Sequence, residues 1–136
     1  MTEEYTSSDL EETKWFIDLD WLDASGRSFT IMAERCLCEN CRRKLIGGKG
    51  EPSADKLIKA IKDCCSTEEY YIHSEMPLME TIFRLILAAG NKPVTLADIG
   101  TQLRERRGSS PGSTSAGALY RLMARDRFYG MNQTAE

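Results

Sequence analysis

The sequence predicts an α+β fold in which an N-terminal β-hairpin and one helix precede a unit of three helices. Three observations predict it. Apolar and polar residues alternate near the N-terminus, apolar residues recur at helical spacing after residue 74, and all five cysteines lie between residues 36 and 65. The first pattern is typical of strands, the second of amphipathic helices, and the third of a site that gathers thiols around one point.

The chain is predicted to contain three segments. Residues 1–13 are polar and acidic and are expected to form a disordered lead-in. Residues 14–73 contain the hairpin, the cysteines and one helix, and residues 74–136 contain the three-helix unit. The net charge is −6 over residues 1–35 and +3 over residues 76–136, which suggests that the two ends contact different partners.

The β-hairpin is predicted from two alternating runs that a turn separates. Residues 15–22 place both tryptophans on one strand face and two aspartates on the other, which is typical of a half-buried strand. Residues 23–27 include Gly26, which suits a turn with positive φ. Residues 29–33 alternate again and supply the second strand. Because the tryptophan face is apolar, we expect it to belong to the core rather than to a binding surface.

Two pairs of cysteines predict a zinc site. Cys38 and Cys41 have the C-x-x-C spacing of a zinc knuckle, in which a tight turn directs two thiolates at one ion. Cys64 and Cys65 lie at the C-terminal end of an amphipathic helix that is predicted over residues 54–65. Zn²⁺ prefers thiolate sulfur and binds four ligands as a tetrahedron. We therefore predict that these four cysteines bind one structural Zn²⁺ ion.

The fourth ligand has three candidates, which are Cys36, Cys65 and His73. Adjacent cysteines bind one ion together only when the end of their helix unwinds, so Cys36 or His73 is an alternative to Cys65. A simpler interpretation is that some of the cysteines are buried as small apolar residues. Four thiolates leave no open coordination position, and the single histidine belongs to no evident nucleophile–base arrangement. We therefore expect neither an enzyme nor a small-molecule substrate.

Three helices and an extended stretch are predicted after residue 74. The first helix is expected over residues 78–89 and the second over residues 96–107. The third is expected to begin at a cap on Ser113 or Thr114, and residues 128–131 are expected to be extended.

Three stretches of this unit carry a family resemblance. They are Ala88-Ala89-Gly90-Asn91-Lys92-Pro93 at the end of the first helix, Leu96-Ala97-Asp98-Ile99 at the start of the second, and Arg125-Asp126-Arg127-Phe128-Tyr129 after the third. With them, residues 77–131 resemble the winged-helix family that includes the delta subunit of bacterial RNA polymerase. The resemblance implies a helix-turn-helix unit that associates with nucleic acid or with polymerase.

Five arginines of the three-helix unit are candidates for binding nucleic acid. Arg121 and Arg125 are four residues apart on one face of the third helix, which enters the major groove in helix-turn-helix proteins. Arg104, Arg106 and Arg107 end the second helix, where they are placed to contact phosphates. The alternative is that these arginines only stabilise the helix dipole and a solvated surface.

The leading functional prediction is a zinc-stabilised winged-helix protein that binds nucleic acid, in transcription regulation or with the translation machinery. One alternative is an adaptor whose acidic, tryptophan-containing hairpin binds a basic protein. Another is a thiol redox sensor that uses Cys36 or Cys65. The first fourteen residues contain five acids and no apolar run, and the longest apolar stretch is too short to span a bilayer. We therefore expect a cytoplasmic protein without a membrane partner.

Overall fold

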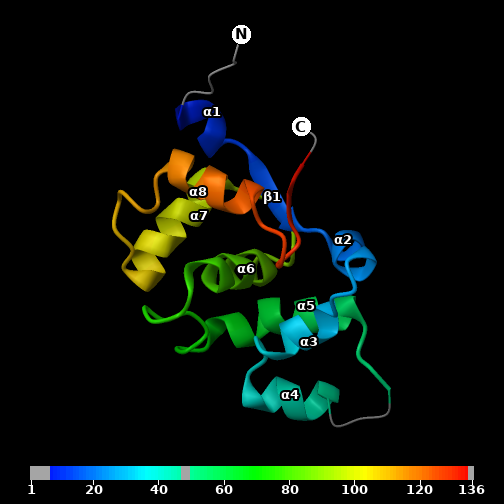
Figure 1. The fold of residues 1–136 in the computed structure, drawn as a ribbon. Coiled ribbons are helices and arrows are strands. Elements are labelled where there is room, and N and C mark those ends of the chain that lie inside the picture. The colour runs from blue at the N-terminus through cyan, green and yellow to red at the C-terminus, as the bar shows by residue number, and fades with distance from the viewer. Residues whose placement is uncertain (1–6, 47–49, 135–136) are drawn as a thin grey trace.

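The computed structural model describes residues 7–46 and 50–134 as a mixed α and β fold (Figure 1). These residues form eight α-helices and one antiparallel sheet of three short strands. In chain order the elements are α1 (Ser7–Glu11), β1 (Lys14–Ile17), α2 (Leu19–Ala24), α3 (Phe29–Glu34), α4 (Glu39–Ile46), α5 (Ala54–Asp63), α6 (Leu78–Ala88), β2 (Val94–Thr95), α7 (Leu96–Gln102), α8 (Ala116–Ala124) and β3 (Met131–Gln133). A 3-10 turn η1 (Cys65–Thr67) follows α5, and a π-helical turn η2 (Leu103–Arg107) continues α7.

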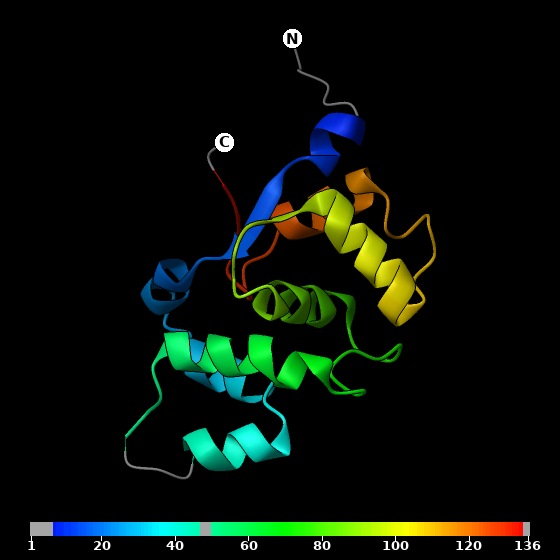
Figure 2. The same cartoon turned by 180° about the vertical axis from the view of Figure 1, so that it is seen from behind.

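The elements are arranged around helix α6. Figures 1 and 2 show α7, α8 and β1 on one side of α6, α3 and α5 on the other, and α4 outermost beyond them. α5 packs on α6, and α3 packs on α5. The buried residues of α6 are Thr81, Ile82, Phe83, Leu85, Ile86 and Leu87. Because these residues point to more than one side of the helix, α6 forms the centre of a single core.

The predicted β-hairpin is wrong. β1 pairs with β2 and β3, which come from the other end of the chain, and residues 29–33 belong to helix α3. After β1 the Asp18 carboxylate accepts a hydrogen bond from the backbone N–H of Trp21 and caps α2, and Ser28 caps α3 in the same way. Aspartate and serine are preferred N-caps. A short alternating run does not by itself separate a strand from a helix, and here the caps favour two short helices.

β1 is the central strand of a sheet with the order β2-β1-β3. Asn91, which has a φ of 58°, fastens this strand to the end of α6. Its side chain accepts a hydrogen bond from the N–H of Ile17 at 2.8 Å and donates one to the carbonyl oxygen of Ile17 at 2.9 Å. The predicted segments 14–73 and 74–136 therefore share a sheet and a core. That the two segments fold independently of each other stays a prediction.

The predicted disordered lead-in differs in part from the structure. Residues 1–6 of it lie outside the described residues. Ser7–Glu11 forms helix α1, which packs against α8 and α7, and Leu10 contacts the core. Leu10 is thus an apolar side chain through which this short helix contacts the core.

Three of the helices predicted from residue 54 onwards begin where they were expected. α5 ends at Asp63 and α6 at Ala88, within two residues of the predicted ends, whereas α7 ends at Gln102 and only the π-helical turn η2 extends it to Arg107. Ser115, rather than Ser113 or Thr114, caps α8 by accepting a hydrogen bond from the N–H of Ala118. Thr114 is instead buried, and its hydroxyl accepts a hydrogen bond from Arg104. None of the helices in the described ranges is both long and apolar enough to cross a membrane.

Arg84 of α6 ties the segment that contains the cysteines to the core. Its guanidinium donates hydrogen bonds to the carbonyl oxygens of Arg35 at 2.9 Å and Tyr71 at 3.0 Å, and lies 3.2 Å from the Glu80 carboxylate. The Tyr71 hydroxyl donates back to the carbonyl oxygen of Arg84. These contacts hold the chain on both sides of the cysteines, so the cysteines are positioned relative to α6.

Candidate metal centre

Two helix ends bring the cysteines together. Helix α4 begins directly after Cys38, so Cys41 lies in its first turn. Helix α5 begins at the Ser53 cap and ends next to Cys64, and Cys65 then opens η1. The backbone of Cys64 has φ −132° and ψ −64°, which is outside the helical region. The unwinding that two adjacent ligands require is therefore present at the end of α5.

The sulfur atoms of Cys38, Cys41 and Cys64 all lie within 4.8 Å of one another. The Sγ atoms of Cys38 and Cys64 are 3.8 Å apart. Two thiolates that bind one tetrahedral zinc ion at about 2.3 Å lie about 3.8 Å apart, so this spacing fits a shared ion. All five cysteines are free thiols. The structure thus forms a three-thiol cluster that could bind a metal ion, and the spacing of Cys38 and Cys64 is too long for a disulfide.

Cys65 is adjacent to this cluster. It is buried, and its Sγ accepts a hydrogen bond from the backbone N–H of Cys38 at 3.1 Å. Backbone N–H donors of this kind stabilise a thiolate and orient it beside a metal. Among the described residues, neither Cys36 nor His73 joins the cluster. The Sγ of Cys36 is 3.8 Å from the carbonyl oxygen of Met32, and His73 is exposed.

The thiols of the cluster differ in acidity. A backbone hydrogen bond from Cys41 to the Cys38 sulfur lowers the pKa of Cys38. Burial raises the pKa of Cys41 to about 11, and hydrogen bonding to Cys41 raises the pKa of Cys64 to about 11. Cys38 is therefore the first thiolate available, and a divalent cation displaces the remaining protons when it binds.

The five predicted nucleic-acid-binding arginines fall into two groups. Arg107 donates two hydrogen bonds to the carbonyl oxygen of Met76, at 3.1 and 2.9 Å, so its guanidinium holds the chain before α6. Arg104 donates to Thr114, and Arg106 donates to the carbonyl oxygen of Ser66 in η1 at 3.3 Å. Arg121 on α8 and Arg125 at its C-cap are exposed, and their guanidinium groups make no hydrogen bond or ion pair within the described ranges.

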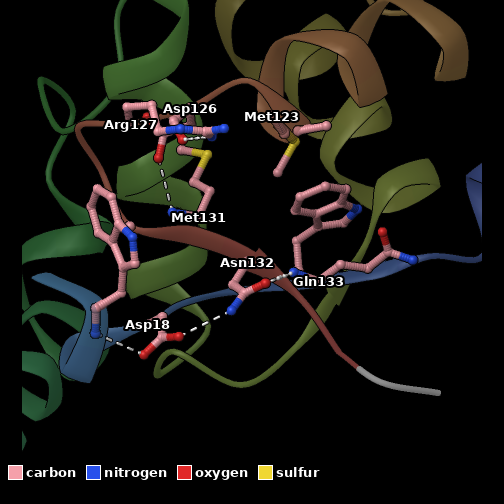
Figure 3. Close-up of a pocket in the computed structure, with 11 residues that line it drawn as sticks. Asp18, Met123, Asp126, Arg127, Met131, Asn132 and Gln133 are labelled. Carbon is pink, nitrogen blue, oxygen red and sulfur yellow. Dashed lines mark hydrogen bonds between the residues drawn. The ribbon is translucent and has the colours of Figure 1, made fainter.

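One pocket was not predicted from the sequence. It has a volume of about 300 Å³ and lies where the end of β1, the start of α2 and the end of α8 meet β3 (Figure 3). Trp15 and Trp21 both line it, although Trp15 is buried and Trp21 is only half-buried. The alternating pattern of residues 15–22 predicted that Asp18 would lie on the solvated face of a strand, whereas it is the N-cap of α2. Its position before an apolar run was a signal for an N-cap, and the pocket itself depends on β3, far away in the sequence.

No family model, curated protein or solved structure matches the chain. The metal centre therefore rests on the geometry of its own thiols. The resemblance of residues 77–131 to the winged-helix family stays a prediction. The same applies to the partners.

Proposed function

We propose that this chain is a zinc-stabilised protein in which Cys38, Cys41, Cys64 and Cys65 bind one Zn²⁺ ion. The observation that carries this proposal is the meeting of three Sγ atoms within 4.8 Å, from two segments far apart in the sequence. Zinc is favoured because thiolates prefer it and because structural zinc sites have four ligands. Cys65 is the best fourth ligand, since its sulfur already accepts the N–H of Cys38.

The ion has a structural role in this proposal. Cys41 is the only buried residue of α4, and the other apolar residues of that helix, Leu45 and Ile46, are only partly buried. An eight-residue helix with one buried side chain is not stable by packing alone. Coordination by Cys41 and Cys38 on one side, and by the end of α5 on the other, supplies the missing attachment of α4.

Elemental analysis tests the metal and its fourth ligand together. We expect about one zinc per chain for the purified protein and for Cys36→Ser, because Cys36 lies outside the cluster. Cys65→Ser should bind zinc more weakly in a competition with a chromogenic chelator. The loss should be at least as large as the roughly tenfold to one hundredfold that removing a hydrogen-bond partner of a ligand costs, since here a thiolate ligand itself is lost. Retention of full affinity by Cys65→Ser, with loss in Cys36→Ser, would assign the fourth position to Cys36 instead.

A second proposed function concerns the exposed face of α8. We infer that α8 binds the backbone of nucleic acid, in keeping with the winged-helix resemblance. The observation that favours it is that Arg121 and Arg125 are exposed one turn apart, while the other candidate arginines bond within the chain. Free guanidinium groups on one helix face are available for phosphate oxygens, and contacts of this kind make binding depend on salt.

The double variant Arg121→Ala with Arg125→Ala should weaken binding to duplex DNA. The slope of log K against log[salt] should also become less steep by about two, because two phosphate contacts are lost. Mobility-shift titrations across salt concentrations measure both effects. Arg43→Ala is the matched control, because Arg43 is also exposed but lies on α4, at the opposite end of the molecule from α8 (Figure 1). It should leave binding nearly unchanged. Absence of binding to duplex DNA or RNA at low salt would rule out this function.

A further inference from the structure

The pocket beside β3 is lined by both polar and apolar side chains. Figure 3 shows Asp18 and Asn132 joined by a hydrogen bond at one end, with Met123, Asp126 and Met131 at the other. The buried Trp15 and the half-buried Trp21 are also among the residues that line it. The pocket thus combines aromatic rings, thioethers and carboxylates within about 300 Å³, which is the size of a small-molecule site.

The two carboxylates of the pocket do different work. Asp126 accepts hydrogen bonds from the backbone N–H groups of Phe128, Tyr129 and Met131, so it is occupied in holding the loop before β3. Asp18 accepts one bond on each oxygen, from the N–H of Trp21 at 3.1 Å and from the Asn132 amide at 3.0 Å. A carboxylate has about four acceptor positions, so Asp18 retains acceptor capacity for a ligand.

The pocket is not suited to an added peptide strand, although β3 is at the edge of the sheet. The N–H of Met131 donates to Asp126 at 3.0 Å, and the N–H of Gln133 donates to the side chain of Asn132 at 2.9 Å. An incoming strand needs these donors to form a ladder. Because side chains already occupy them, a compact ligand fits this edge better than an extended peptide.

We propose that this pocket binds a small organic cation with an alkylammonium head. Indole rings attract a cation to their faces, and the carboxylate of Asp18 adds the attraction of an opposite charge. The pocket wall has two carboxylates, those of Asp18 and Asp126, against the single guanidinium of Arg127. The site is independent of the cysteine cluster, with which it shares no residue.

Tryptophan fluorescence reports directly on this site, because Trp15 and Trp21 are the only two tryptophans of the chain. Titration with choline should change the emission saturably, in the millimolar range. Dimethylbutanol, the neutral carbon isostere of choline, should bind at least about fivefold more weakly, because it lacks the charge. Equal binding of the two compounds would overturn the proposal, since the pocket would then select only apolar shape.

Two variants locate the contact. Asp18→Asn should weaken choline binding about fivefold to tenfold while α2 stays capped, because asparagine caps helices as well as aspartate does. Asp20→Asn removes the same charge from an exposed position on the same helix, outside the pocket, and should bind choline almost as the native chain does. Equal losses in the two variants would mean that choline responds only to the general charge of α2 and would overturn the proposal.

A second variant tests the site if Asp18→Asn destabilises the protein. Trp21→Leu removes a half-buried ring and leaves Trp15 as the reporter. It should weaken choline binding, which the indole N–H resonance of Trp15 in a nitrogen–proton correlation spectrum would follow. Indole resonances of the native chain that do not move at saturating choline would refute the site.

Discussion

Removal of zinc should lower the thermal stability of the protein more than any single substitution outside the cluster. A structural zinc site contributes on the order of 10 kcal/mol, which is comparable with the whole stability of a small domain. Unfolding should start at α4, because Cys41 is its one buried side chain and the proposed ion would attach it through Cys38 and Cys41. Circular dichroism melts with and without a strong chelator measure it, and the affinity for zinc should fall as the pH falls because protons compete for the thiolates.

Cys41→Ala is the genetic counterpart of chelation. It should melt at the temperature of the chelated native chain, and chelator should change its melt very little. Cys36→Ser serves as the control, since its thiol lies outside the cluster and the chelator should still lower its melting temperature. Native protein that melts at one temperature with and without chelator would show that the cysteines stabilise the fold only by packing.

Gly130→Ala should be strongly destabilising. Gly130 has a φ of +75°, and a Cβ there would lie 2.8 Å from Cγ of Leu22, which is fully buried. The carbonyl oxygen of Gly130 also accepts the N–H of Asp18 at 2.7 Å, so the backbone is not free to move away. The left-handed conformation and the overpacking together should cost about 2–4 kcal/mol and lower the melting temperature by roughly 10 °C.

Gly26→Ala separates the two contributions to this cost. Gly26 has nearly the same φ, +77°, but no heavy atom lies within 4 Å of the position of an added Cβ. Its substitution should therefore cost only the conformational part, about 1 kcal/mol. Chemical denaturation of both variants in the same zinc-containing buffer gives the two free energies of unfolding. Equal losses would mean that Leu22 moves aside and that the contact does not constrain the fold.

Much of the helical structure was accessible from the sequence. The amphipathic repeat of α5, the apolar run of α6 and the capping residues of α7 are local signals. They predicted the starts of all three helices and the ends of α5 and α6 to within two residues. The prediction of a hairpin was wrong for a local reason too. Asp18 and Ser28 are N-caps that favour two short helices over the strands suggested by a short alternation of apolar and polar residues. The true partners of β1 could not be predicted, because Val94 and Gln133 lie far away along the chain and carry no pairing signal.

The candidate sites divide in the same way. The C-x-x-C spacing and the second cysteine pair identified the thiols of the cluster, since metal ligands must be soft and close together. Which thiols meet depends on the unwound end of α5, which a repeat pattern does not reveal. The five arginines were equivalent as a charge pattern, and only their surroundings separated Arg107, bonded to Met76, from Arg121 and Arg125.

The sequence by itself determined the helices from residue 54 onwards, the gathering of thiols between residues 36 and 65, and the basic character of the C-terminal helices. These features depend on residue type and short spacings, which any local window contains. Only the tertiary structure decided that β1 completes a sheet with the chain's far end, that three Sγ atoms converge, and that two tryptophans and Asp18 share a pocket. Such contacts join residues that are distant along the chain, and their energy is gained only when the whole core packs.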